Sequence, residues 1–223
     1  MIKAIFYKEW IKTKWTALLS ISILGGFSAF LLFNLYRMIE IKGAVHIWDV
    51  MIQRDALFVN LLQYIPLLVG IAFGVTQFVP EMTRKCLKLT LHLPFDATRM
   101  IFTMLSYGTI SLILIFSAVL LTFYGVLSTL LVSELVRHIL LSMLVWFVAG
   151  IAAYLLTAWI VLEPTWKRRI LNILIGVFLL KLFFFESAGE AYNGFLPLLA
   201  IYGLLCGSFA FISVARFKEG KQD

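Results

Sequence analysis

Six stretches of this sequence are apolar over a length that can cross a lipid bilayer. A transmembrane helix needs about 20 mostly apolar residues to cross about 30 Å of hydrocarbon. The stretches that meet this requirement are residues 16–36, 58–79, 101–131, 139–162, 169–186 and 195–215. The third is longer than required, so we expect it to tilt, to break near Gly125 or to project beyond the bilayer. The pattern predicts an all-α integral membrane protein, with six spans in a single domain over residues 1–223.

The composition supports lipid as the main solvent of this chain. Hydrophobic residues make up 62% and charged residues 14% of the 223 residues, whereas a soluble domain carries about 25% charged residues. A soluble protein of this size exposes too much surface to hide 20 Phe, 6 Trp and 8 Tyr in one core. A water-soluble single-core protein is therefore excluded.

The distribution of Lys and Arg predicts the orientation of the chain. Six spans place both termini on one side, and short cytoplasmic loops carry an excess of cations. With the termini inside, 14 of the 19 Lys and Arg fall in inner segments, four in outer segments and one, Lys181, in the fifth span. Both termini are therefore predicted to be cytoplasmic. The net charge of +7 follows from this bias and suits anionic membrane lipids, so no nucleic-acid partner is needed.

Residues 2–14 differ in character from the spans. Phe6 and Trp10 recur one helical turn apart, whereas Lys8 and Lys12 share another face. This pattern predicts an amphipathic helix that lies in the inner interface, with its lysines reaching towards anionic headgroups. The alternative is a solvated basic tail, in which the aromatic side chains would be exposed to water without a partner.

The residue types that catalysis requires are not gathered in one place. The only Gly-Lys pair, Gly220-Lys221, is followed by Gln222 and does not end a phosphate-binding loop. The three histidines fall in three different predicted loops, so we expect no metal site. The polar residues of the spans do not combine a nucleophile with a base; they are Asn34, Gln63, Gln77, Asn172 and Lys181. We therefore expect a chain that is not an enzyme and binds no cofactor.

Lys181 is the one charge deep in a predicted span. A functional role is one interpretation. The interpretation that we favour is that Lys181 snorkels to the outer surface or pairs with Glu186.

Two pairs of glycines, Gly70–Gly74 and Gly203–Gly207, have the Gly-xxx-Gly spacing that lets helices approach closely. Packing within the chain is the commoner meaning of this spacing, and contact with a second copy is the alternative. The two cysteines, Cys86 and Cys206, fall in a predicted inner loop and a predicted span, so we expect both to be free thiols.

The longest predicted inner loop is Glu81–Arg99. It combines leucines at 87, 91 and 93 with basic Arg84, Lys85 and Lys88. This composition suits a short amphipathic element that lies under the membrane and offers an apolar ridge to a cytosolic protein. Pro94 ends that element. The residues that we expect to carry the contact are Glu81, Arg84, Lys88, Leu91, Leu93, Pro94 and Phe95.

This loop resembles the loop between spans two and three in the permease subunits of ABC-2 type transporters. The family's loop reads approximately Glu, a few polar residues, Gly-Thr, alternating leucines, then Leu-Pro and a basic residue. The matching residues are Glu81, Leu87, Leu89, Leu91, Leu93, Pro94 and Arg99, whereas Lys85 and Cys86 replace the usual Gly-Thr. The segment Lys8-Glu9-Trp10 also resembles the family's Lys-Glu-aromatic elbow helix, in which Phe6 would lie. Many members carry re-entrant helices or a larger domain between spans five and six, where this chain has only residues 186–194.

The resemblance implies the permease subunit of an ATP-driven ABC transporter, an exporter, in the cytoplasmic (inner) membrane of a prokaryote. It implies two permease copies, identical or different, over two cytosolic ATPase subunits that hold ATP and Mg, with Glu81–Arg99 as the coupling helix. Two other functions remain open. A six-span substrate-capture subunit of a vitamin importer would bind its ligand without an ATPase. A small intramembrane lipid-modifying enzyme would need catalytic groups that the spans do not provide.

Overall fold

The structure is a computed structural model, and it describes residues 2–42, 59–83, 96–185, 192 and 194–218. Every regular element in this part of the chain is a helix, which confirms the all-α prediction for it. In chain order the elements are α1 (Ile2–Lys42), η1 (Asn60–Leu62), α3 (Ile65–Thr83), α5 (Ala97–Leu130), α6 (Ser133–Leu162), α7 (Trp166–Lys181), η2 (Leu182–Phe184), α8 (Leu196–Leu205) and α9 (Ser208–Lys218).

Five helical segments of the described residues are long and apolar enough to cross a membrane. They are Ile2–Ile41, Asn60–Thr83, Ala97–Leu130, Ser133–Leu162 and Leu196–Lys218. The chain is thus a multi-pass membrane protein by length and composition, but the predicted fifth span, 169–186, is not confirmed. In that region α7 has 16 residues, about 24 Å at 1.5 Å per residue. Lys181 is exposed and is the last residue of α7, so it lies at the end of a helix rather than deep within one.

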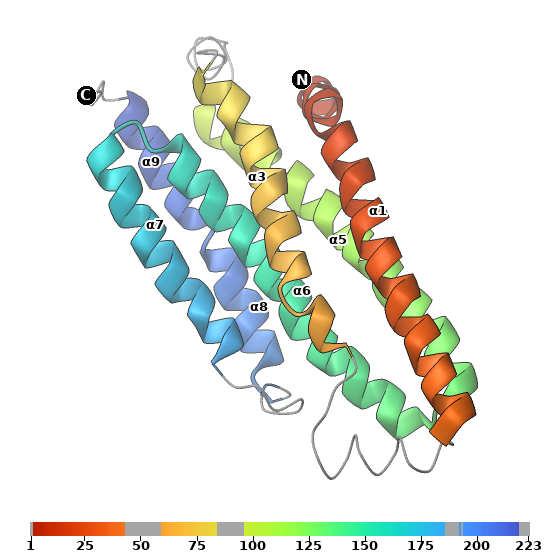
Figure 1. The fold of residues 1–223 in the computed structure, drawn as a ribbon. Coiled ribbons are helices and arrows are strands. Elements are labelled where there is room, and N and C mark those ends of the chain that lie inside the picture. Colours follow the sequence, from red (N-terminus) through yellow and green to blue (C-terminus); the bar gives the residue numbers. More distant parts are fainter. Residues whose placement is uncertain (1, 43–58, 84–95, 186–191, 193, 219–223) are drawn as a thin grey trace.

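The predicted elbow over residues 2–14 and the first predicted span form one continuous helix, α1, of 41 residues. A separate elbow helix is therefore not confirmed. Figure 1 shows the first turns of α1 nearly end-on while the rest runs along the bundle, so the helix bends near its N-terminus. The Thr13 hydroxyl donates a hydrogen bond of 2.9 Å to the carbonyl oxygen of Glu9, one turn earlier. Bonds of this kind bend helices, because they compete with the backbone ladder.

Other boundaries also differ from the prediction. Helix α5 continues without a break through Gly125. Helix α6 begins at Ser133, several residues before the predicted start of its span. The last predicted span is divided between α8 and α9, because Gly207 donates its N–H to the carbonyl oxygen of Leu204 (3.0 Å) and closes the final turn of α8. Cys206 at this break is buried and forms no disulfide, whereas Cys86 lies outside the described residues.

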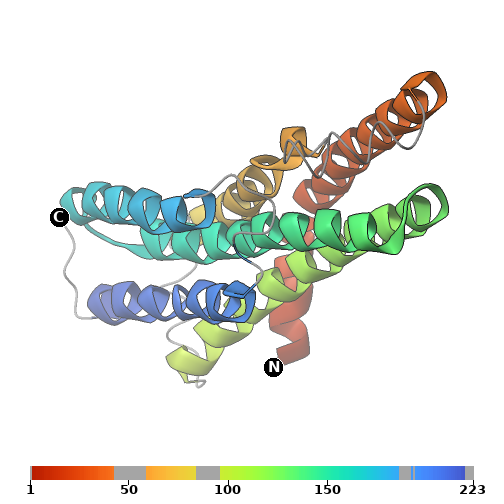
Figure 2. The same cartoon turned by 90° about the horizontal axis from the view of Figure 1, so that it is seen from below.

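Helix α6 is the centre of the bundle. It contacts α3, α5, α7, α8 and α9, whereas α1 packs on α3 and α5. Seen from below, α6 lies between α7 and the pair α8 and α9 (Figure 2). The helices alternate in direction, so the start of α1 and the end of α9 lie at the same end of the bundle (Figure 1). We call this the terminal end.

Helices α3 and α6 approach so closely that their backbones touch. A Cβ atom on Gly70 would overlap the carbonyl oxygen of Gly150, and a Cβ atom on Gly150 would lie 2.6 Å from the carbonyl oxygen of Pro66. A Cβ atom on Gly74 would likewise lie 2.9 Å from the side chain of Thr157. The motif Gly70–Gly74 therefore packs within the chain, which was the favoured interpretation of its spacing.

Candidate functional site

Two buried carboxylates and two lysines meet between α1 and α3 at the terminal end. The ammonium nitrogens of Lys8 and Lys12 lie 2.7 and 2.6 Å from the same atom, Oε1 of Glu81. The Lys12 nitrogen also lies 2.7 Å from Oε1 of Glu9. Glu9 is 0% and Glu81 1% exposed. We call these four residues the Glu81 cluster.

Helical spacing and charge balance explain why these groups can be buried together. Lys8 and Lys12 are four residues apart on α1, so they lie on one face and reach the same acceptor, and Glu9 is three residues from Lys12. Burying an unpaired charge is costly. Here two negative charges offset two positive ones, and the Lys8 side chain keeps 37% of its surface exposed. The cluster therefore joins α1 to the end of α3 without leaving a net charge.

This pairing corrects one prediction. Lys8 and Lys12 were expected to reach towards lipid headgroups, but their ammonium groups turn inward to Glu81. The sequence contains one signal for such an arrangement. Glu81 lies just after an apolar span, and Glu9 lies one helical turn before Lys12. If either carboxylate is buried, it needs a cationic partner.

The hydrogen bonding of the Glu81 cluster is incomplete. Lys12 donates to Glu81 Oε1 and to the carbonyl oxygen of Gln77 (3.4 Å). Its ammonium group also forms an ion pair with Oε1 of Glu9 at 2.7 Å. Within the described part of the chain, both carboxylate oxygens of Glu9 and Oε2 of Glu81 accept no hydrogen bond. Glu9 Oε1 is held by the Lys12 ammonium as an ion pair, whereas Glu9 Oε2 and Glu81 Oε2 have neither a hydrogen bond nor an ion pair among the described residues and are available for another arrangement of the same lysines.

A layer of uncharged polar groups lies beside the cluster. The hydroxyl groups of Thr13 on α1 and Tyr107 on α5 are 2.8 Å apart and share a hydrogen bond. The ring of Phe6 packs edge-on against Tyr107, with centroids 5.4 Å apart. Helix α5 is therefore linked to the same turn of α1 that carries Glu9.

Gln77 and Tyr154 extend this layer to α6. The Gln77 side-chain amide donates to the carbonyl oxygen of Met104 (2.9 Å), and the Tyr154 hydroxyl donates to Gln77 Oε1 (2.8 Å). Both side chains are 0% exposed. Gly108 makes this possible, because a Cβ atom there would overlap the Tyr154 hydroxyl. The sequence identified Gln77 only as a polar residue of a span, and its role depends on three helices that meet around it.

A second ionic cluster lies at the terminal end between α6 and α9. Arg216 donates to Glu163 Oε1 (3.0 Å), Ser213 donates to Oε2 (2.7 Å), and Thr165 donates to Oε1 (3.2 Å). Both oxygens of this buried carboxylate are satisfied. Arg169 at the start of α7 donates to the carbonyl oxygen of Glu163 at 2.8 Å, which caps the C-terminus of α6. We call Glu163, Thr165, Ser213 and Arg216 the Glu163 cluster.

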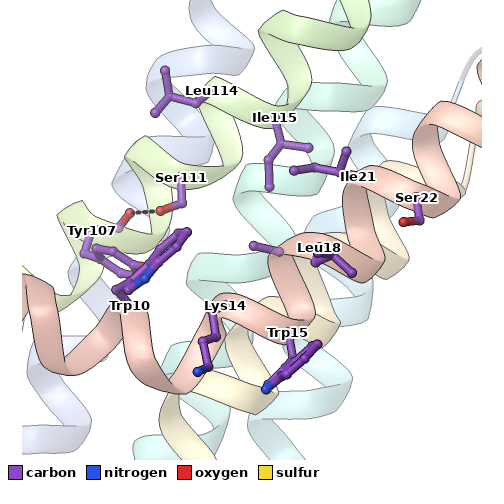
Figure 3. Close-up of a pocket in the computed structure, with 11 residues that line it drawn as sticks. Trp10, Lys14, Trp15, Leu18, Ile21, Ser22, Tyr107, Ser111, Leu114 and Ile115 are labelled. Carbon is purple, nitrogen blue, oxygen red and sulfur yellow. Dashed lines mark hydrogen bonds between the residues drawn. The ribbon is translucent and has the colours of Figure 1, made fainter.

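The structure brings together some of the predicted site residues. Glu81, which was predicted to begin the loop, lies instead in the last turn of α3, where it meets Lys8 and Glu9 of α1. Trp10 is half-exposed beside α5 (Figure 3). Arg99 is exposed and lies 3.9 Å from Asp96, at the start of α5. The remaining residues of the predicted coupling loop lie outside the described residues: Arg84, Lys88, Leu91, Leu93, Pro94 and Phe95.

Comparison with known proteins assigns no family to the chain. No family model, no curated protein and no solved structure matches it. In the described ranges, no group of three or more His, Cys, Asp or Glu residues is placed to hold a metal ion. What the chain does is therefore inferred from its own residues.

Proposed function

We propose that this chain is the membrane-spanning permease subunit of an ATP-driven ABC transporter of the ABC-2 type. The observation that carries the proposal is the contact of Glu81 with Lys8 and Lys12. Glu81 lies in the last turn of α3, where the chain enters the proposed coupling loop. The two lysines belong to the N-terminal segment that resembles the family's elbow. A displacement of the loop would therefore act on α1 as well as on α3.

The proposed mechanism follows from which contacts are rigid and which can change. The backbone contact between Gly70 and Gly150 fixes α3 to α6 in the first half of α3. At the end of α3, Glu81 holds α1 through two lysines and leaves acceptor atoms open. Closure of two ATPase subunits would move the loop, shift the lysines among the acceptors and tilt α1, with α5 following through the bond between Thr13 and Tyr107. Repeated tilting would open the pathway to alternate sides.

The proposal includes the partners and the location of the assembly. Two permease copies, identical or different, would sit over two cytosolic ATPase subunits that hold ATP and Mg, in the cytoplasmic membrane of a prokaryote. The terminal end would face the cytoplasm, as the cation distribution favours. Both Gly-xxx-Gly motifs pack against α6, so a second copy would use another surface. The direction of transport would be export.

The test is capture of the partner. The chain is purified from its native membrane with a tag at residue 223, and co-purifying proteins are identified by mass spectrometry. We expect a protein with a phosphate-binding loop, and we expect it to be lost when Leu91 and Leu93 are both changed to Asp, because charge enters an apolar contact. The control is Lys167→Asp, which changes the charge at an exposed position at the start of α7 and should retain the partner.

Three results would contradict the proposal. The first is the absence of any ATPase from a preparation that is intact by size. The second is an ATPase that remains bound to the double Asp variant. The third is a monodisperse single copy that binds a small ligand without an ATPase, which would favour the substrate-capture function.

A further inference from the structure

A groove runs between α1 and α5, and its lining residues all belong to these two helices. Its first part has a volume of about 720 Å³ and a second part about 450 Å³. The two parts share Ile21, Leu114 and Ile115, so they adjoin along α1 and α5. Figure 3 shows α1 and α5 side by side with the lining side chains between and beside them. Small residues of α1 leave the space along it: Ala17, Ser22, Gly25, Ser28 and Ala29.

The lining carries a single charge. Lys14 is the one ionisable cation among the residues that line the two parts, and no acidic residue lines either part. Lys8 and Lys12 are paired with Glu81, but Lys14 has no acidic partner among the residues that the structure describes. Its ammonium group lies 5.8 Å from the centre of the Trp15 ring. The groove thus offers an uncompensated positive charge at one end and an apolar surface along the rest.

The distance along α1 that the first part of the groove covers matches the thickness of one leaflet, with Lys14 near the headgroups. The first part of the groove extends along α1 from Trp10 to Ser22, which is about 18 Å at 1.5 Å per residue. Half of the hydrocarbon core is about 15 Å. Trp10 and Trp15 are both exposed at the same end as Lys14, and Trp is typical of the membrane–water interface. Lys14 therefore lies at headgroup depth when the apolar part lies along the acyl chains.

We propose that the groove between α1 and α5 binds an anionic phospholipid of the leaflet at the terminal end. Its phosphate lies at Lys14, and one acyl chain lies along Leu18, Ile21 and Leu114. A zwitterionic lipid fits the same apolar surface but carries no net negative charge for Lys14 to compensate. The site therefore selects by headgroup charge, and it is independent of any ATPase partner.

The headgroup is tested by lipid titration of the delipidated full-length chain in detergent, followed by native mass spectrometry. The probes are phosphatidylglycerol and phosphatidylcholine with identical acyl chains. We expect tighter binding of phosphatidylglycerol, and an approximately fivefold loss of that binding in Lys14→Gln, since one interfacial lysine contributes this much towards an anionic lipid. Phosphatidylcholine binding should fall less, because its choline group partly compensates the phosphate that Lys14 contacts. The control Lys167→Gln removes one positive charge from another exposed site at the terminal end and should leave both affinities unchanged.

The groove itself is tested by filling it. Ser22 lines the groove, whereas Leu19 is 56% exposed on the same helix and does not line it. We expect Ser22→Trp to abolish the preference for phosphatidylglycerol and Leu19→Trp to retain it. Equal binding of the two lipids by the unmodified chain would overturn the proposal, as would equal losses in Lys14→Gln and Lys167→Gln. A dimer that Ser22→Trp dissociates, with lipid binding unchanged, would also overturn it and identify the groove as a contact between copies.

Discussion

The two sides of α6 are held together in different ways. On one side, α3 contacts α6 backbone to backbone at Gly70 and Gly150. On the other side, α8 and α9 pack through side chains: a Cβ atom on Gly203 would lie 3.5 Å from that of Ala152, an ordinary contact distance. Each side also has one ionic cluster at the terminal end. The Glu163 cluster is fully hydrogen-bonded, whereas the Glu81 cluster leaves two carboxylate oxygens with neither a hydrogen bond nor an ion pair from any described residue.

This difference indicates which cluster is structural and which can change. A buried carboxylate with all its acceptors filled has one favourable arrangement, and any displacement breaks bonds without replacing them. A carboxylate pair with open acceptors can exchange the same lysines between oxygens. We therefore expect the Glu163 cluster to hold α6 and α9 together and the Glu81 cluster to transmit movement between α3 and α1.

The largest effect is expected from Glu163→Leu. This change leaves Arg216, whose side chain is only 17% exposed, without its counterion, and breaking a buried pair costs about 3–5 kcal/mol. Unfolding is measured in detergent through the labelling rate of the buried thiol of Cys206, in a chain with Cys86→Ser. The double variant Glu163→Leu with Arg216→Leu should recover most of the loss. If Glu163→Leu alone were as stable as the unmodified chain, the inference that the Glu163 cluster holds α6 and α9 together would be wrong.

A somewhat smaller effect is expected from Gly70→Ala. The added methyl group overlaps the backbone of α6, and overpacking of this kind costs about 1–3 kcal/mol. The matched control is Gly203→Ala, where the space admits a methyl group and the gain in helix propensity is at most about 1 kcal/mol. The same thiol-labelling measurement compares the two. Equal losses at both glycines would show that the two sides of α6 are packed alike.

Glu81→Gln should cost less stability than Glu163→Leu, because Lys8 is partly exposed and Lys12 keeps Glu9 nearby. The loss of charge-assisted hydrogen bonds suggests about 1.5–3 kcal/mol at most. A double-mutant cycle with Lys12→Gln measures the coupling between the two residues. Additive losses would contradict the ion pair. Under the proposed function, Glu81→Gln should also lower the transport rate per folded protein. A transport assay normalised to the amount of folded protein measures this effect.

The smallest effect is expected from Glu9→Gln. The Glu9 carboxylate accepts no hydrogen bond in the described part of the chain, and a neutral amide of similar shape is less costly to bury. This gain offsets only part of the lost attraction to Lys12 and of the positive charge left on the cluster, so the change should cost about 1 kcal/mol of stability, less than Glu81→Gln. The unfolding midpoint in detergent is the measurement. A loss as large as that of Glu81→Gln would show that both carboxylates are held equally, and the contrast between the two clusters would disappear.

Much of the fold could be predicted from the sequence because the lipid solvent imposes a length on each helix. Apolar stretches of about 20 residues locate α1, α3, α5, α6 and the pair α8 and α9. The spacing of Gly70–Gly74 also indicated a close helix contact, because only small residues allow one. Boundaries were less certain, since hydropathy averages over a window. It did not detect the end of α7 at Lys181 or the break at Cys206 and Gly207.

The candidate site depended on tertiary structure in a way that no local pattern records. Lys12 and Glu81 are 69 positions apart, and an ion pair between them requires that α1 and α3 pack in one register. Tyr154 and Gln77 are 77 positions apart and meet only because Gly108 leaves the space. Sequence by itself determined that the chain is helical, apolar and built for a membrane, because burial in lipid acts on each segment separately. Only the packing of the helices decided which charged groups are paired and which carboxylate oxygens accept no hydrogen bond, because electrostatic pairing acts between segments that are distant in the sequence.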